Sequence, residues 1–505
     1  MKLKPRTLLA GLSPLLLAGC VSTSELALQT APYEDTKAGF QTVSAKSSAA
    51  LGKRTAWAQT QDETRKLKQE VHGLIHKKTI SADTAVQVAL LNNKALQAAY
   101  SDIGIDAADV WQQMLPENPK VSIGIFGIGA PELILFRALE SMVATNLQAM
   151  MTRERRVDIA KTRFEQTQLK AVDETLRLAA DTRRAWIRAV SAFETVSYLK
   201  QGQIAADAAS ELAKRLGESG AMPKAGQARE HAFYAELTGQ LAEARLNAEL
   251  AKEELTRLMG LWGSEVDYFV PDKLPQLPQK LKAGSAIEAE ALKNRVDLQI
   301  ARLELDLAAK AFGLTEATRY VTDLELFSGV EAEQEIETEY ELVSGNLEES
   351  KARKVVVTPQ LEVEFAIPIY DTGKARLRKA ELTYLRGANQ LAAKAVNIRS
   401  EARSAFKNYR ARHEIGRHYK RNVLPLREKI EEESLLTYNG MITNTFELLA
   451  DTRAKINTLL MSVNAKRDFW LADADLNAAI YGPGFGGGGG GDAAPAMADA
   501  GGSPH

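Results

Sequence analysis

The stretch NNKALQ at residues 92–97 has a counterpart in NRVDLQ at residues 294–299. The apolar positions continue in step after each stretch, since Ile103 and Ile105 correspond to Leu305 and Leu307. Around these two stretches, the same order of elements is predicted for residues 80–280 and again for 281–482: short helix, strand, strand, long helix and short helix. An internal repeat in a sequence indicates the architecture of the fold, so it is considered before single residues are assigned a function. We therefore expect a two-fold internal repeat.

The helices predicted in each half have matched lengths. Apolar residues recur at helical spacing from about Glu140 to Leu216, which is roughly 115 Å of helix at 1.5 Å per residue. The flanking helices, expected at 81–115 and 225–260, are each near half that length. The second half repeats this with 285–318 and 443–480 beside a long helix from about Lys374 to Glu433, in which Pro425 predicts a kink. Helices of this length need neighbours along their whole apolar stripe, so self-association is expected.

A long hairpin with two different faces is predicted at residues 323–368. Its first strand alternates apolar residues such as Leu324 and Leu326 with acidic ones, and the strand that returns after residues 344–346 does the same. A weaker pair is expected in the first half, at Val121 to Ile125 and Leu133 to Phe136. Four strands cannot close a membrane barrel, whereas three copies give twelve. The predicted fold is thus mainly α, with four strands per chain contributing to a trimeric 12-stranded barrel.

The N-terminus reads as an export signal. Lys2, Lys4 and Arg6 precede an apolar run, which is followed by LAGC at residues 17–20. This string is similar to the bacterial lipoprotein box, which implies a signal peptide at 1–19, lipid on Cys20 and, with Val at position 21, sorting to the outer membrane. Residues 20–79 are then expected to be a lipid-anchored tether and 483–505 a flexible Gly-rich tail. Cys20 is the single cysteine, so no intrachain disulfide can form.

Composition limits the classes of function. The net charge of −1 gives no global basic field for nucleic acid. No segment after the N-terminus reaches the roughly 20 apolar residues of a spanning helix, so a membrane could be crossed only by strands. His413 and His418 are five residues apart and so cannot form an i,i+4 zinc pair, and His72 with His76 supplies only two ligands. The sequence therefore predicts no metal site, no cofactor and no enzyme activity.

Residues 80–481 resemble the TolC-type outer-membrane efflux proteins. The similarity rests on the repeat, on NRVDL at 294–298, on IPIYDTGK at 367–374, where the last strand enters the long helix, and on YNGMITNTFELL at 438–449, similar to the family's second periplasmic tip. The first half departs from the family by reading LFRALE at 135–140 before its long helix. The resemblance implies a homotrimeric duct that works with a periplasmic adaptor protein and an inner-membrane pump and contacts outer-membrane lipid.

Two groups of residues are candidates for function. In a membrane barrel the polar face lines the lumen, so we expect Glu325, Glu362 and Glu364 to face the pore. These carboxylates could favour cationic cargo or only form a wet lumen. The resemblance places a second group near the periplasmic constriction, where its members could form a gate or only keep a coiled-coil surface soluble: Asn439, Asn444, Glu447 and Asp451.

The sequence leads to the hypothesis of an outer-membrane exit duct for passive transport in an efflux or secretion system. Drugs, metal ions and polypeptides all remain possible as cargo, and the acidic strands slightly favour metal or other cations. The alternative is a periplasmic coiled-coil lipoprotein that acts as a structural scaffold. That alternative explains the helices and the anchor but not the two-faced strands.

Overall fold

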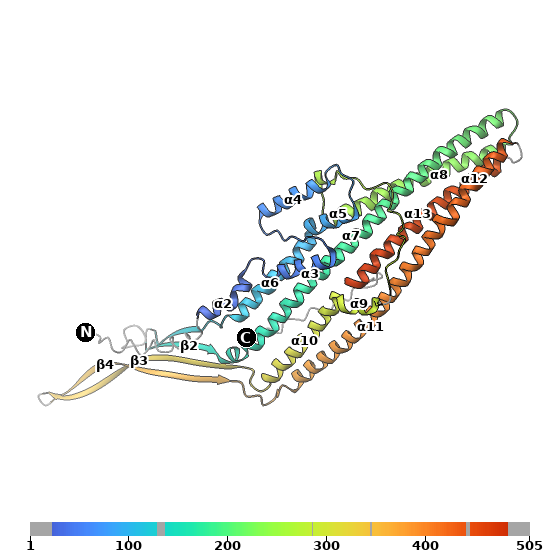
Figure 1. The fold of residues 1–505 in the computed structure, drawn as a ribbon. Coiled ribbons are helices and arrows are strands. Elements are labelled where there is room, and N and C mark those ends of the chain that lie inside the picture. The colour runs from blue at the N-terminus through green and yellow to red at the C-terminus, as the bar shows by residue number, and fades with distance from the viewer. Residues whose placement is uncertain (1–22, 129–136, 285, 344–345, 441–444, 483–505) are drawn as a thin grey trace. The chain divides into compact units, whose positions relative to one another are not determined.

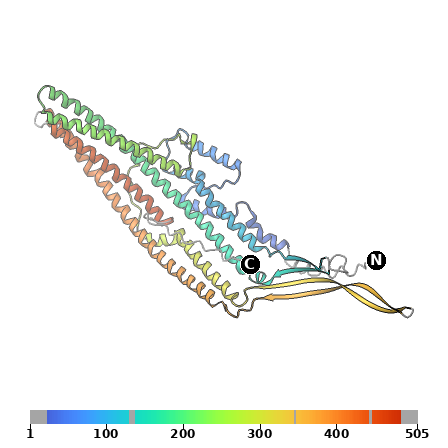
Figure 2. The same ribbon diagram turned by 180° about the vertical axis from the view of Figure 1, so that it is seen from behind.

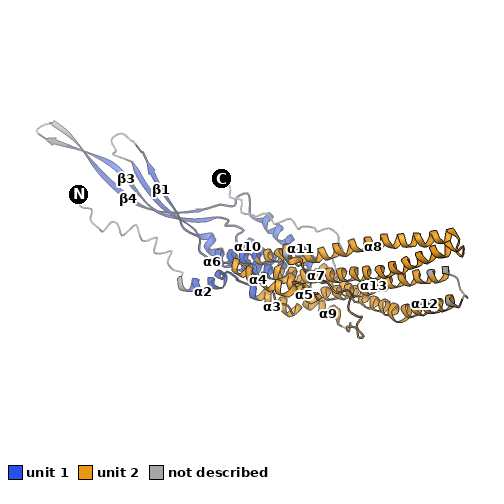
Figure 3. Ribbon diagram, turned by 90° about the horizontal axis from the view of Figure 1, so that it is seen from above, with its two compact units in different colours: residues 1–41, 101–168, 300–391 blue, residues 42–100, 169–299, 392–505 orange. Residues whose placement is uncertain are grey.

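A computed structural model describes residues 23–128, 137–284, 286–343, 346–440 and 445–482. The predicted signal peptide, Cys20 and the Gly-rich tail lie outside these ranges. The chain divides into two compact units, and each contains part of the helices α6, α7, α10 and α11. Unit 1 comprises residues 1–41, 101–168 and 300–391, and unit 2 comprises 42–100, 169–299 and 392–505 (Figure 3).

The order of elements from residue 82 to residue 258 recurs from 287 to 481. The first run is α5 (Ala82–Asn92), α6 (Lys94–Met114), β1 (Lys120–Phe126), β2 (Ala138–Asn146), α7 (Leu147–Glu218) and α8 (Lys224–Leu258). The second is α9 (Ile287–Asn294), α10 (Val296–Ala317), β3 (Leu324–Val343), β4 (Asn346–Phe365), α11 (Lys374–His418), α12 (Leu424–Asn439) and α13 (Thr445–Tyr481). The residues that end α5 and α9 adopt nearly the same backbone conformation, with φ −64° and ψ 124° at Asn93 and φ −64° and ψ 121° at Arg295.

Helices also occupy the segment expected to be a tether. They are α2 (Thr23–Glu34), α3 (Phe40–Leu51) and α4 (Gln61–Ile75). A capping box starts α4, because the Thr60 side chain accepts from the backbone N–H of Glu63 and the Glu63 side chain accepts from that of Thr60. Val71 and Ile75 are buried on its inner face. The three helices give this segment secondary structure that its Ser-, Ala- and Gln-rich composition did not predict.

The start of the first long helix differs from the expected position. Residues 138–146 are strand β2, and α7 begins at Leu147 rather than near Glu140. The backbone N–H of Ala149 donates to the side-chain oxygen of Asn146 at 2.8 Å, which satisfies one of the free donors at a helix start. β-Branched Val143 and Thr145 favour the strand before this cap. The prediction of helix from Glu140 was therefore wrong, and that of a strand at Leu133 to Phe136 lies outside the described residues.

The predicted break at Pro425 takes the form of a π-helical turn. Residues Tyr419–Val423 form this turn between α11 and α12, and Pro425 lies in the first turn of α12. Proline has no N–H to donate to the preceding turn, so a local change of helix type accommodates it. The long helix is thus interrupted where the sequence indicated.

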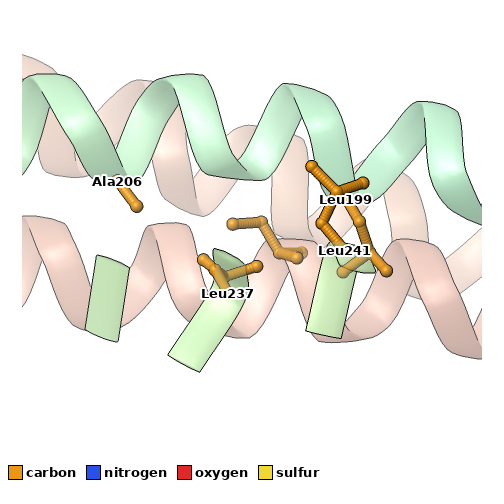
Figure 4. Close-up of a cluster of buried hydrophobic side chains, with 5 residues drawn as sticks. Leu199, Ala206, Leu237 and Leu241 are labelled. Atoms are coloured by element: carbon orange, nitrogen blue, oxygen red, sulfur yellow. The ribbon is translucent and has the colours of Figure 1, made fainter. Parts of the chain in front are cut away.

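A hydrophobic core joins the two helical hairpins of unit 2. Leu199 and Ala206 of α7 pack with Leu237 and Leu241 of α8 and with Ile456 of α13 (Figure 4). The α7–α8 hairpin and the α12–α13 hairpin end side by side (Figures 1 and 2). Within the described part of the chain, no helix is both long enough and apolar enough to cross a membrane.

The four strands of unit 1 form one antiparallel sheet in the order β1-β2-β3-β4. β3 and β4 pair along their full length from Leu324↔Phe365 to Val343↔Asn346, as the predicted hairpin required. β2 reaches only as far as Glu333 on β3, so the rest of β3 pairs with β4 alone. The β3–β4 hairpin is therefore the longer of the two, as Figure 1 shows.

Candidate pore and tip residues

The register of the sheet places the three candidate pore carboxylates on one face. Glu325 is directly opposite Glu364, and Glu362 is directly opposite Phe327. Opposite residues in an antiparallel ladder share a face, and residues two apart on a strand do as well. Glu325, Glu362 and Glu364 therefore face the same side. The acidic positions Glu331, Glu333, Glu335 and Glu337 of β3 follow on this side.

The opposite face of the sheet is apolar and exposed. Val121, Ile123 and Ile125 of β1 share it with alternate residues of β4, as the register shows. The exposed fractions of Leu361 and Val357 are 74% and 62%. An apolar sheet face that the chain leaves open indicates a surface for lipid or another apolar partner.

A few cations and amides contact the acidic face. Lys120 of β1 lies 3.6 Å from Glu325, and Arg137 lies 3.3 Å from Glu333. The Gln360 side chain donates to Glu331 at 2.7 Å. Both ion pairs have exposed cations and contribute little to stability. The face thus keeps an acidic character along β3 and β4.

At the tip of unit 2, the structure ties α12 to α13 through polar side chains. Ser434 donates to Asp451, and Lys455 pairs with Glu431. Glu447 lies in the first turn of α13 and is exposed. The side chain of Asn439 and the whole of Asn444 lie outside the described residues. Asp451, one of the four candidate tip residues, is therefore bound to the neighbouring helix of its own chain.

A contact between the two hairpins was not predicted from the sequence. Arg453 of α13 lies over the ring of Phe233 of α8 at 4.0 Å, and its Nη2 is 3.3 Å from both carboxylate oxygens of Glu230. The Glu230 side chain is only 4% exposed. More than 220 residues separate Glu230 from Arg453, so no local pattern could reveal the pair. Because the Glu230 carboxylate is buried, loss of the Arg453 charge would leave it unpaired and destabilise the contact between the two hairpins.

The NRVDL motif at 294–298 builds a buried ionic network in unit 2. Arg295 binds both carboxylate oxygens of Asp297, at 2.9 and 2.7 Å, and also pairs with Glu401. Lys394 of α11 is 3.2 Å from Asp297. Burial alone would raise the pKa of Asp297, but the hydrogen bonds and charge of Arg295, and then Lys394, outweigh it and hold that pKa below its usual value. The network thus joins the end of α9 and the start of α10 to α11.

Asp173 of α7 lies beside this network, and its pKa shifts in the opposite direction from that of Asp297. Its Oδ1 is buried and has no hydrogen-bond partner among the residues that the structure describes. Burial raises the pKa of Asp173 to about 6, and the charge of Asp297 adds to the effect. This carboxyl group is therefore the one in the network most ready to take up a proton.

The candidate histidines make local ring contacts and hydrogen bonds. The ring of His413 is buried and its Nε2 is 2.9 Å from the carbonyl oxygen of Pro278, so the N–H donates there. The Asn422 side chain is 3.0 Å from Nδ1 of His418, and His72 stacks on His76 with ring centroids 4.3 Å apart. Among the described residues, no group of three or more His, Cys, Asp or Glu side chains gathers as a metal ion would require.

Solved structures of outer-membrane channels share this fold. CusC, studied for transmembrane channel formation, superposes with a TM-score of 0.63 at 15% identity over 80% of this chain and 92% of its own. The CmeC outer membrane channel of Campylobacter jejuni gives 0.61 at 17% identity over 85% and 89%, and the outer membrane protein VceC of Vibrio cholerae gives 0.61 at 15% over 80% and 96%.

These comparisons confirm the resemblance at the level of fold. The chain has the fold of the TolC-type outer-membrane efflux channels. No protein-family model matches the sequence, and neither does any curated protein.

Proposed function

We propose that this chain is the outer-membrane exit duct of an efflux or secretion system. Three copies assemble so that their sheets close a 12-stranded barrel and their helices form a tunnel. The observation that carries the proposal is the sheet with one exposed apolar face and one acidic face, in a chain that has the fold of outer-membrane channels. Lipid meets the apolar face and water fills the acidic side.

The edges of the sheet support assembly from copies of the chain. β1 and β4 each have a strand neighbour on one side only. Every backbone N–H and C=O needs a partner in the hydrocarbon core, so an open edge cannot stay unpaired there. Pairing β4 of one copy with β1 of the next satisfies the seven residues of β1 and the matching part of the longer β4, and closes the ring at that level. The recurring order of elements, which we interpret as an internal repeat, gives each copy two hairpins of strands and two of helices.

Transport through the duct is passive. Glu325, Glu362 and Glu364 of three copies line the lumen and create a negative potential that favours cationic cargo, including metal ions. The tip residues Asn439, Asn444, Glu447 and Asp451 lie at the periplasmic constriction and close it. A periplasmic adaptor and an inner-membrane pump deliver cargo there. The signal at residues 1–19 is removed, and lipid on Cys20 anchors the mature chain in the outer membrane.

Single-channel recording in planar lipid bilayers tests this function. Purified protein that inserts and gives discrete, reproducible conductance steps supports a duct. Protein that assembles but never conducts, even when Glu447→Ala and Asp451→Ala remove charge from the proposed constriction, favours the alternative of a periplasmic coiled-coil scaffold. The exposed apolar sheet face argues against that alternative, because a scaffold in water has no use for it.

A further inference from the structure

Unit 2 leaves two helices with one open side each. Figure 3 shows α8 and α12 along opposite edges of the helical layer, with α7 and α13 between them. The buried residues of α8, such as Leu237 and Leu241, face α7 and α13. The side of α8 that points away carries Leu246 and Leu250, which are 60% and 59% exposed. Leu426 of α12 is 61% exposed. Both edges therefore present apolar residues that are largely exposed in the described part of the chain.

Among its exposed charges, each of these two edges has a set of one sign that is opposite to the set on the other edge. On α8 the exposed Glu236 and Glu243 are seven residues apart, and Glu253 lies seven after Leu246, so all lie near one stripe. On α11 and the π turn, Arg410, Arg417 and Arg421 are exposed at spacings of seven and four. In the described chain, the three glutamates form no ion pair, and Arg410 has only an exposed contact at 4.0 Å with Glu414.

The charges also lie at matching depths. Glu253 is 29 residues after the start of α8, and Arg410 is 29 residues before the end of α12, which is about 44 Å of helix in each case. Glu243 and Arg421 lie 19 and 18 residues from the same ends. The Glu230–Arg453 contact shows that the two hairpins end at the same level. Rotation about a common axis keeps each depth unchanged, so these charges meet when copies form a ring.

We propose that α8 of one copy packs against α11 and α12 of a second copy through a charge-matched seam. The seam has apolar contacts from the exposed leucines and three ion pairs at successive depths: Glu236 with Lys429, Glu243 with Arg421, and Glu253 with Arg410. Exposed pairs add little affinity each, but charges at fixed spacing select the partner edge and its register. This inference rests on the proposed ring of copies and identifies the surface that builds it.

Cross-linking at one depth tests the seam. The Glu253→Cys, Arg410→Cys double variant is treated with a short bifunctional maleimide, since the lipid proposed on Cys20, the single native cysteine, leaves that residue no free thiol. Dimers and trimers linked covalently through these positions are expected on a denaturing gel. The matched control is Glu253→Cys with Arg399→Cys on the same helix. Arg399 lies 11 residues further along, about 16 Å from the matching depth, so this pair should not link.

Charge reversal gives a second measurement. Glu243→Arg and Arg421→Glu should each lower the trimer fraction in native mass spectra at low salt. The two together should restore it, because every copy then carries the pair with inverted sign. Trimers that persist in both single variants and never link at 253 and 410 overturn the seam but leave the duct intact. Wild-type protein that remains a monomer contradicts the proposed function itself. Links that form only after a different periplasmic protein is added also overturn the seam, since the partner is then not a second copy.

Discussion

Glu325 on β3 lies directly opposite Glu364 on β4, so two carboxylates share one cross-strand position on the same face of the sheet. Like charges directly opposite each other destabilise a strand pair. Lys120 is 3.6 Å from Glu325 but is itself exposed, so it offsets little of this repulsion. We therefore expect the negative charge at this position to have a use in the proposed lumen.

Replacing the pore carboxylates tests that use. The Glu325→Gln, Glu362→Gln, Glu364→Gln triple variant should shift the cation/anion permeability ratio toward one, because nine negative charges disappear from the proposed lumen of three copies. Reversal potentials under a salt gradient measure this ratio. Glu249→Gln, exposed on α8, is the matched control and should change nothing. An unaltered permeability ratio in the triple variant would mean that these carboxylates do not make the lumen selective for charge.

Arg295→Ala should destabilise unit 2 strongly. The substitution leaves Asp297 buried without its main partner, and removing one member of a buried ion pair typically costs about 3–5 kcal/mol. Thermal unfolding in detergent should show a clear drop in melting temperature. Arg302→Ala, exposed on the adjoining helix α10, serves as control and should cost little. Equal melting temperatures for the two variants would show that the network does not stabilise the fold.

Asp173 predicts how stability depends on pH. Its pKa is raised from 3.8 to about 6 in the folded chain, so the folded state binds this proton more tightly than the unfolded state. The resulting stability is fully present below about pH 4 and is lost as pH rises through 6. A shift of about two units corresponds to about 3 kcal/mol. Melting temperature should therefore rise as pH falls from 7.5 to 5, and Asp173→Asn should flatten this profile. A wild-type curve that is flat or falls over this range would contradict the burial of Asp173.

The tip residues predict a change in conductance. Glu447→Ala with Asp451→Ala should raise single-channel conductance, because both remove charge from the proposed constriction. Ser434→Ala separates two explanations, since Ser434 donates to Asp451 within one chain. If Ser434→Ala reproduces the increase, the contact acts by tying α12 to α13 rather than by closing the gate between copies. If neither variant changes conductance, the gate lies elsewhere.

Much of this architecture could be predicted from local pattern. The alternation from Leu324 onward fixed both faces of the β3–β4 hairpin, and helical spacing with Pro425 located the long helices and their break. β2 was missed because its nine residues contain small and polar side chains that also suit a helix, and only the Asn146 cap marks the boundary. The Glu230–Arg453 and Asp297–Lys394 pairs join helices far apart in sequence, so they depend on packing that local spacing does not encode.

Native mass spectrometry of the detergent-purified mature protein counts the copies in the proposed duct. We expect a trimer in which each chain begins at Cys20 and carries added lipid mass. A lipid-modified protein that stays monomeric across detergents would contradict the duct and leave the scaffold as the better explanation.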